Sequence, residues 1–130
     1  MNALTQIRLS PDEAAANAAV ISKAVVRAAL QLDIRQVELA AMLGISPASV
    51  SRLMAGEHVL AASSKPYELA VLVIRLFRSL SGIFGSDSVS TKAWLRCENT
   101  ALGGVPASLM ASATGLVNAV AYTDAARARI

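Results

Sequence analysis

One short internal segment constrains the fold more than any other part of the chain. Residues 36–56 read QVELAAMLGISPASVSRLMAG, and apolar side chains recur at helical spacing on both sides of Gly44. Gly44 falls where a three-residue turn needs a left-handed backbone, and Ser46-Pro47 offers a cap and a first-turn proline to the helix that follows. The segment therefore predicts two short helices that cross closely over a tight turn. The residues expected to face inward are Leu39, Ala40, Leu43, Val50 and Leu53.

Composition extends the helical prediction to the whole chain. Hydrophobic residues make up 55% of the 130 residues and aromatic residues only 4%, so small and aliphatic side chains must form the core. Alanine and leucine favour helices, whereas the aromatic residues that favour strands are scarce. We expect an all-α protein with a helix-turn-helix bundle over residues 1–60 and a second helical domain over residues 61–130.

Start and stop signals place the remaining helices. Ser10-Pro11 with Glu13 predicts a capping box, and a helix without breakers follows to about Leu32. Ser90 is expected to cap a later helix. The predicted helices span 11–32, 36–43, 47–54, 66–83, 91–99, 106–113 and 115–128. The apolar stripe expected on the first helix is Val20, Ala24, Val25, Ala28 and Leu32.

The long helix over residues 66–83 is apolar around most of its circumference. A helix of this kind is central to a core or to an oligomer interface. We expect it to be the spine that joins both halves and to mediate a homodimer. Its polar residues are predicted to form one narrow strip: Lys65, Glu68, Arg75, Arg78 and Ser79.

The segment over residues 36–56 resembles the Xre/Cro-like helix-turn-helix, with a glutamine that opens the first helix and a Gly-Ile-Ser turn. In such domains the second helix enters the major groove, so the resemblance implies promoter DNA as a partner. Arg52 alone could form a bidentate contact with guanine. The alternative is a bundle of the same shape that binds no DNA. The residues implied to contact DNA are Gln36, Ser46, Pro47, Ala48, Ser51 and Arg52.

The C-terminal segment WLRCENTALGGVPASLM, residues 94–110, is compatible with a core-forming turn, the start of a membrane span or a surface for a partner. The membrane interpretation fails, because Gly103, Gly104 and Pro106 interrupt the uncharged stretch and a spanning helix needs about 20 unbroken apolar residues. Trp94 is expected to pack in the core and to pin the turn beneath it. The two glycines permit positive φ and the close approach of a neighbouring helix or of a partner.

Residues from Trp94 to the end resemble the toxin-binding domain of the MbcA/ParS/Xre antitoxin family. The residues that carry this resemblance are Trp94-Leu95, Asn99, Leu102-Gly103-Gly104, Pro106, Leu109, Gly115-Leu116 and Val120. The resemblance implies a RES-domain toxin that consumes NAD⁺ and whose active site the antitoxin covers. The C-terminal tail is either a plug for that pocket or a solvated end. The residues expected to bind the toxin are Asn99, Gly103, Gly104, Pro106, Arg127, Arg129 and Ile130.

An enzyme is not expected, since the chain has a single histidine, His58, and lacks a phosphate-binding glycine loop and metal-ligand spacing. We therefore predict no cofactor and no metal. The start of the chain lacks a charged leader followed by an apolar run, and Cys97 is the only cysteine, so a cytoplasmic protein is expected. Two functions remain: an antitoxin that represses its own operon, or a stand-alone helix-turn-helix regulator with a C-terminal dimerisation domain.

Overall fold

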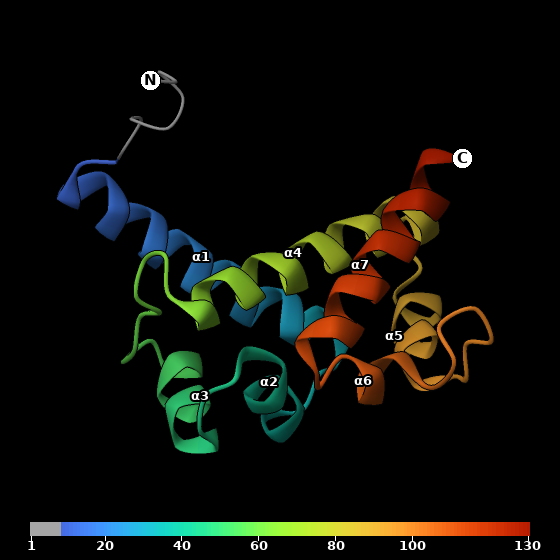
Figure 1. Ribbon diagram of the computed structural model, residues 1–130, viewed down its shortest axis with the longest axis horizontal. Coiled ribbons are helices and arrows are strands. Elements are labelled where there is room, and N and C mark those ends of the chain that lie inside the picture. The colour runs from blue at the N-terminus through green and yellow to red at the C-terminus, as the bar shows by residue number, and fades with distance from the viewer. Residues whose placement is uncertain (1–8) are drawn as a thin grey trace.

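The computed structural model describes residues 9–130 as a bundle of α-helices, so the predicted all-α class is confirmed (Figure 1). Residues 1–8 lie outside the described residues. The predicted N-terminal domain includes them, and the expectation that the chain has no leader rests on them. The helices are α1 (Pro11–Leu32), α2 (Gln36–Leu43), α3 (Pro47–Met54), α4 (Lys65–Phe84), α5 (Ser88–Arg96), α6 (Pro106–Leu109) and α7 (Ala113–Ala128).

The first three helices have the predicted bounds because their local signals are strong. Ser10 and Glu13 form the predicted capping box at the start of α1. Gly44 ends α2 with a φ of 69°, a left-handed conformation that costs glycine little, and the Ser46 hydroxyl caps α3 by accepting from the Ser49 N–H. All five side chains expected to face inward from α2 and α3 are buried.

Helix α4 runs through the middle of the molecule, with α1 packed on one side and α7 on the other (Figure 1). The predicted spine is therefore correct in position, and the chain itself covers most of the apolar circumference. The buried apolar residues of α4 are Leu69, Ala70, Val73, Ile74, Leu76 and Leu80. The predicted polar strip is wrong at Ser79, which is buried because its hydroxyl donates to Asp124 of α7 at 2.6 Å.

Four predicted bounds of the last three helices are wrong for local reasons. Asp87, not Ser90, caps α5, since its carboxylate accepts from the Ser90 N–H at 3.0 Å. Helix α5 then ends at Arg96, and α6 is a single turn that ends at Leu109. Helix α7 begins at Ala113 because Ser112 caps it by accepting from the N–H of Gly115.

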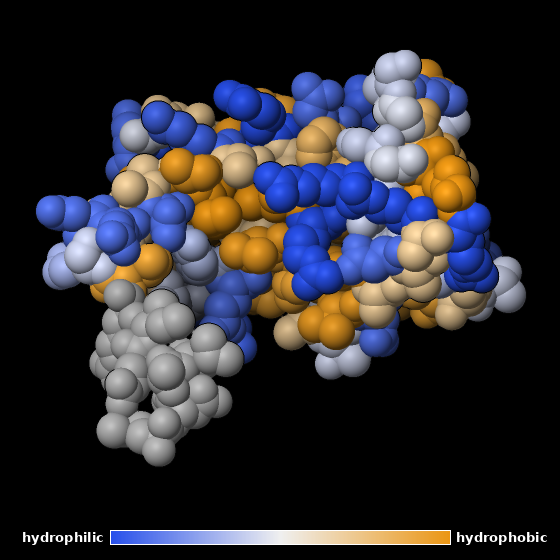
Figure 2. All heavy atoms as spheres, turned by 90° about the horizontal axis from the view of Figure 1, so that it is seen from above, coloured by the Kyte–Doolittle hydropathy of each residue, from blue (hydrophilic) through white to orange (hydrophobic). Residues whose placement is uncertain are grey.

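The apolar stripe predicted for α1 is also wrong at one end. Val25, Ala28 and Leu32 are buried against the body of the bundle, but Val20 is 63% exposed. The first turns of α1 extend past the start of α4 (Figure 1), so neighbouring helices do not cover them. Hydrophobic side chains reach the surface in separate patches between hydrophilic ones (Figure 2).

An ion pair connects the helix-turn-helix to the second half of the chain. Arg96, the last residue of α5, donates to both carboxylate oxygens of Glu38 in the first turn of α2, at 2.5 and 2.8 Å, and also to the Asp33 carbonyl. Glu38 is only 13% exposed and also accepts from the Arg35 N–H at the start of α2. These hydrogen bonds, led by that from Arg96, lower the pKa of Glu38 to about 2.

The glycine at position 115 allows α6 and α7 to pack closely, which generates a first prediction. A Cβ there would lie 1.8 Å from the Leu109 carbonyl oxygen, a backbone atom that cannot move aside. We expect Gly115→Ala to lower the free energy of unfolding by about 3 kcal/mol in urea titrations. Gly82→Ala is the matched control, because its Cβ would meet only the flexible Arg127 side chain, 2.8 Å away. Equal effects of the two substitutions would contradict this account.

The Glu38 pKa generates a prediction about acid stability. Because folding lowers this pKa from 4.5 to about 2, the carboxylate stabilises the fold fully above pH 4.5 and loses that contribution as the pH falls toward 2. Glu38→Gln should therefore lower the free energy of unfolding at pH 7 by about 1–3 kcal/mol, and the difference from wild type should shrink through that interval. Glu68→Gln is the control, since that exposed carboxylate pairs only with Lys65 of its own helix. A difference that does not vary with pH would contradict the assignment.

Candidate functional site

The recognition helix α3 presents an open face to solvent. All six residues implied to contact DNA are exposed, so the bundle leaves the predicted face free: Gln36, Ser46, Pro47, Ala48, Ser51 and Arg52. The helices beneath this face are fixed by Leu39 and Leu43 of α2 and Val50 of α3, which are fully buried. The face is therefore held rigidly, as a surface that reads base edges requires.

Arg52 supplies the only charged side chain of α3. Its guanidinium donates to the Ser49 hydroxyl at 3.2 Å, which in turn accepts from Ser46 at the start of the helix. This chain of hydrogen bonds draws the guanidinium toward the N-terminal turn of α3. A planar guanidinium in this position can donate twice to a guanine edge or to a phosphate.

A closed turn follows α5 and forms the first part of the expected toxin-binding surface. Asn99 organises it, because its N–H donates to the Gly104 carbonyl at 2.8 Å and its own carbonyl accepts from Gly103 and Gly104. Its side-chain oxygen also accepts from the Leu102 N–H at 3.0 Å. The asparagine thus folds the turn back on itself, as its position before the two glycines predicts.

The remaining residues of this turn have different environments. Gly103 is exposed with a φ of 84°, whereas Gly104 packs against the Leu109 side chain. Pro106 is buried at the first position of α6, so it fixes where the turn ends. The glycine pair therefore supplies one left-handed residue and one close contact within the chain.

The tryptophan before the turn is shared between core and surface. Trp94 is half-buried and stacks on Tyr122 of α7 with ring centroids 6.5 Å apart, while the adjacent Leu95 is fully buried. The expectation of a core residue thus holds in full for Leu95 and in part for Trp94. Cys97, which falls within the predicted helix 91–99, is instead exposed just after α5.

The C-terminal tail is exposed, and its two arginine side chains contact residues of α4 and α7. Arg127 belongs to the last turn of α7, and its side chain lies over Gly82 of α4. Arg129 is exposed and donates to the Ala125 carbonyl at 3.3 Å, and Ile130 is 80% exposed. In Figure 1 this tail lies at the upper right, well above the loop between α5 and α6 that holds the glycine turn, so the expected toxin-binding residues form two separate areas.

Sequence reasoning missed the polar contacts that hold these surfaces in place. Besides Glu38 and Arg96, Asp124 accepts from Ser79 at 2.6 Å and from Arg75 at 2.5 Å, which fixes α7 on α4 and lowers the pKa of Asp124, chiefly through Ser79. The one sequence signal was Gly82, because a glycine inside a long helix indicates that another group packs closely against it. In the structure that group is the Arg127 side chain.

Two kinds of feature are absent from residues 9–130. No cluster of three or more histidine, cysteine or carboxylate side chains there could hold a metal ion. Within the same residues, the helices are too short or too polar to cross a membrane.

Two family comparisons agree with these surfaces. Residues 11–75 match the Antitoxin Xre-like helix-turn-helix domain, and residues 79–129 match the Antitoxin Xre/MbcA/ParS C-terminal toxin-binding domain. A comparison with curated proteins found no match. The first match covers half of the chain and the second covers most of the rest. The two matches follow one another along the chain, with the helix-turn-helix before the toxin-binding domain. The chain therefore belongs to the Xre/MbcA/ParS family of type II antitoxins, with a helix-turn-helix followed by a toxin-binding domain.

Proposed function

We propose that this antitoxin inhibits a RES-domain toxin that degrades NAD⁺, by covering its active site, and that it represses its own operon by binding promoter DNA. The observation that carries the proposal is the presence of two separate surfaces on one rigid core. One is the open face of α3, and the other consists of two areas, the glycine turn and the end of α7. We propose residues 1–60 as the DNA-binding part and residues 61–130 as the toxin-binding part of a cytoplasmic homodimer.

The DNA half of the proposal is supported by exposure and by residue type. Ser46 and Ser51 can donate to or accept from bases and phosphates, and Arg52 adds a charge at the same face. Pro47 and Ala48 offer only apolar contact, so one copy makes few phosphate contacts. Two copies on a symmetric operator would double those contacts.

The toxin half of the proposal is supported by the position of the arginines. Arg129 and Ile130 are exposed at the end of α7, and Arg127 is exposed although its side chain lies against α4. Guanidinium groups form bidentate hydrogen bonds with acidic or carbonyl oxygens, so these arginines can bind such acceptors in the toxin's pocket. We propose that the tail enters the pocket while the glycine turn contacts its rim.

The DNA proposal predicts the effect of one substitution. Arg52→Ala should weaken binding to the operon's own promoter fragment by about tenfold in a gel-shift titration, because a bidentate base contact is lost. Arg78→Ala removes an equal charge from an exposed position of α4 and should leave affinity within about twofold. Unchanged binding by Arg52→Ala would exclude base reading by α3.

The toxin proposal predicts the effect of shortening the tail. Deletion of residues 127–130 should abolish protection in cells that express the cognate RES-domain toxin, with growth and cellular NAD⁺ as the readouts. Because Arg127 also packs on α4, Arg129→Ala is tested beside the deletion and should reduce protection without changing the circular dichroism melting curve. Lys92→Ala, an exposed change on α5, serves as the control. Full protection by the shortened chain would rule out a plug.

A further inference from the structure

The outer face of α1 carries a row of exposed residues that no helix in the described part of the chain covers. At steps of three and four residues, these side chains share one face of the helix. They are Glu13, Ala16, Val20, Lys23, Arg27 and Leu30, and every one is exposed. Val20 and Leu30 are 63% and 64% exposed, so this face leaves two large aliphatic side chains open to solvent.

Two of the three charged residues on this face, Glu13 and Arg27, lie symmetrically about Val20, whereas the counterpart of Lys23 is the uncharged Asn17. Glu13 lies seven residues before Val20 and Arg27 lies seven residues after it. Each therefore lies about 10 Å from Val20 along the axis, in opposite directions. If a second α1 lies antiparallel with Val20 on the two-fold axis, each Glu13 falls opposite the other copy's Arg27. The same register places Leu30 beside Ser10 and the exposed Leu9.

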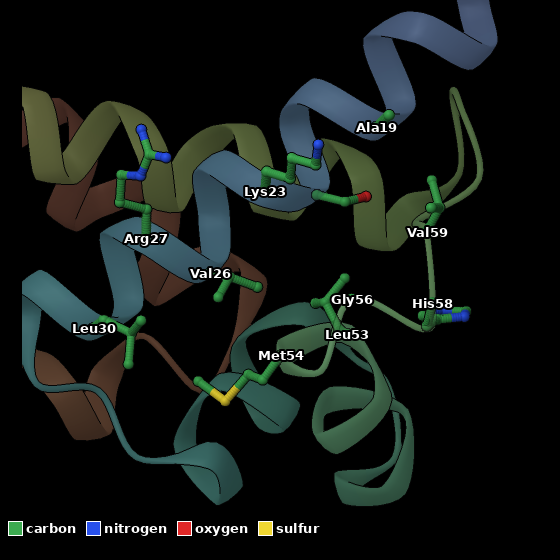
Figure 3. A pocket seen from close by; sticks show the side chains of 11 residues that line it. Ala19, Lys23, Val26, Arg27, Leu30, Leu53, Met54, Gly56, His58 and Val59 are labelled. Carbon is green, nitrogen blue, oxygen red and sulfur yellow. The ribbon is translucent and has the colours of Figure 1, made fainter.

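A groove beside this face would receive the other copy. It has a volume of about 320 Å³ and separates α1 from the end of α3 and the loop that follows. Val26 and Leu30 of α1 and Met54 of α3 point toward one another across it, while Lys23 and Arg27 direct their charged ends away from that apolar floor (Figure 3). The loop wall is fixed, because the Leu60 N–H donates to the buried Ser22 hydroxyl at 2.9 Å.

Within residues 9–130, no acidic residue lines the groove. The acidic start of α1 from the other copy would complement its charge. Lys23, Arg27 and His58 are its titratable side chains, all of them basic. The first turn of α1 carries Asp12 and Glu13, and Ala15 and Ala16 behind them are small enough for two helix backbones to approach closely. Among residues 9–17 all but Ala14 are exposed, so this end of α1 is free to reach another molecule.

We infer that the chain forms a two-fold symmetric homodimer through antiparallel α1 helices, with the start of each α1 along the groove of the other copy. The occupant is a second copy because this face complements itself, as the identical surfaces of a two-fold dimer must. The inference deepens the proposed function, since it rests on the need for two recognition helices. It places the dimer contact on α1, because every large apolar residue of α4 is buried or partly buried within one chain and none is exposed.

Charge reversal tests the pairing of Glu13 with Arg27. In sedimentation velocity of the full chain without DNA or toxin, wild type should form a dimer of twice 13.5 kDa at micromolar concentration. Glu13→Arg and Arg27→Glu should each raise the dissociation constant about tenfold or more, because both symmetric pairs become repulsive. The double variant Glu13→Arg/Arg27→Glu should recover the wild-type value. Lys92→Glu, on α5, controls for net charge.

Cross-linking tests the position of the axis. In a Cys97→Ser background, Val20→Cys should give a covalent dimer with a short bismaleimide, because residue 20 meets its own copy. Lys92→Cys in the same background should give none.

Four outcomes would each overturn the inference: a monomeric wild type, unchanged single variants, a double variant that fails to recover the wild-type dissociation constant, or no cross-link at residue 20. If Arg27→Glu instead reduces protection from the toxin while wild type stays monomeric, the face belongs to the toxin. Gel-shift and growth assays of wild type report on the proposed function independently of these outcomes.

Discussion

The need to bury α4 is the constraint on which the rest of the structure depends. This helix is apolar around most of its circumference, so it can exist in water only if other helices cover it. Helix α1 covers it from the N-terminal half and α7 from the C-terminal half. The helix-turn-helix and the C-terminal domain are consequently built on one shared core, and the Glu38–Arg96 pair adds a second, polar connection between them.

Signals confined to a few neighbouring residues were predictable, and contacts across the fold were not. The capping box at Ser10 and Glu13, and the left-handed Gly44, set the bounds of α1 and α2 without help from distant residues. At the start of α5 the predicted cap, Ser90, is wrong. Asp87 prevails over Ser90 because its carboxylate accepts from both the N–H and the hydroxyl of Ser90. The sequence alone offered no means of weighing the two.

In the candidate sites, too, the features set by neighbouring residues were predictable and those set by distant contacts were not. The open face of α3 follows from the helix-turn-helix spacing, because that spacing decides which residues turn inward and leaves the others exposed. The glycine turn could be predicted as a turn, but the burial of Pro106 depends on where α6 packs. Arg127 was expected only as a tail residue. Its contact with Gly82 joins positions 45 residues apart, and no local pattern encodes it.

Self-association of this chain must overcome a net charge of +3 on each copy. That repulsion acts between charges spread over the whole surface, and at physiological ionic strength it is largely screened beyond about 8 Å. The Glu13–Arg27 pairs that antiparallel α1 helices would form act at contact distance, where screening is much weaker. Their attraction also depends on register, because a shift of one helical turn separates both pairs at once. Opposite charges at the two ends of one exposed helix therefore favour a single arrangement of two copies, even for a basic protein with little apolar surface left on α4.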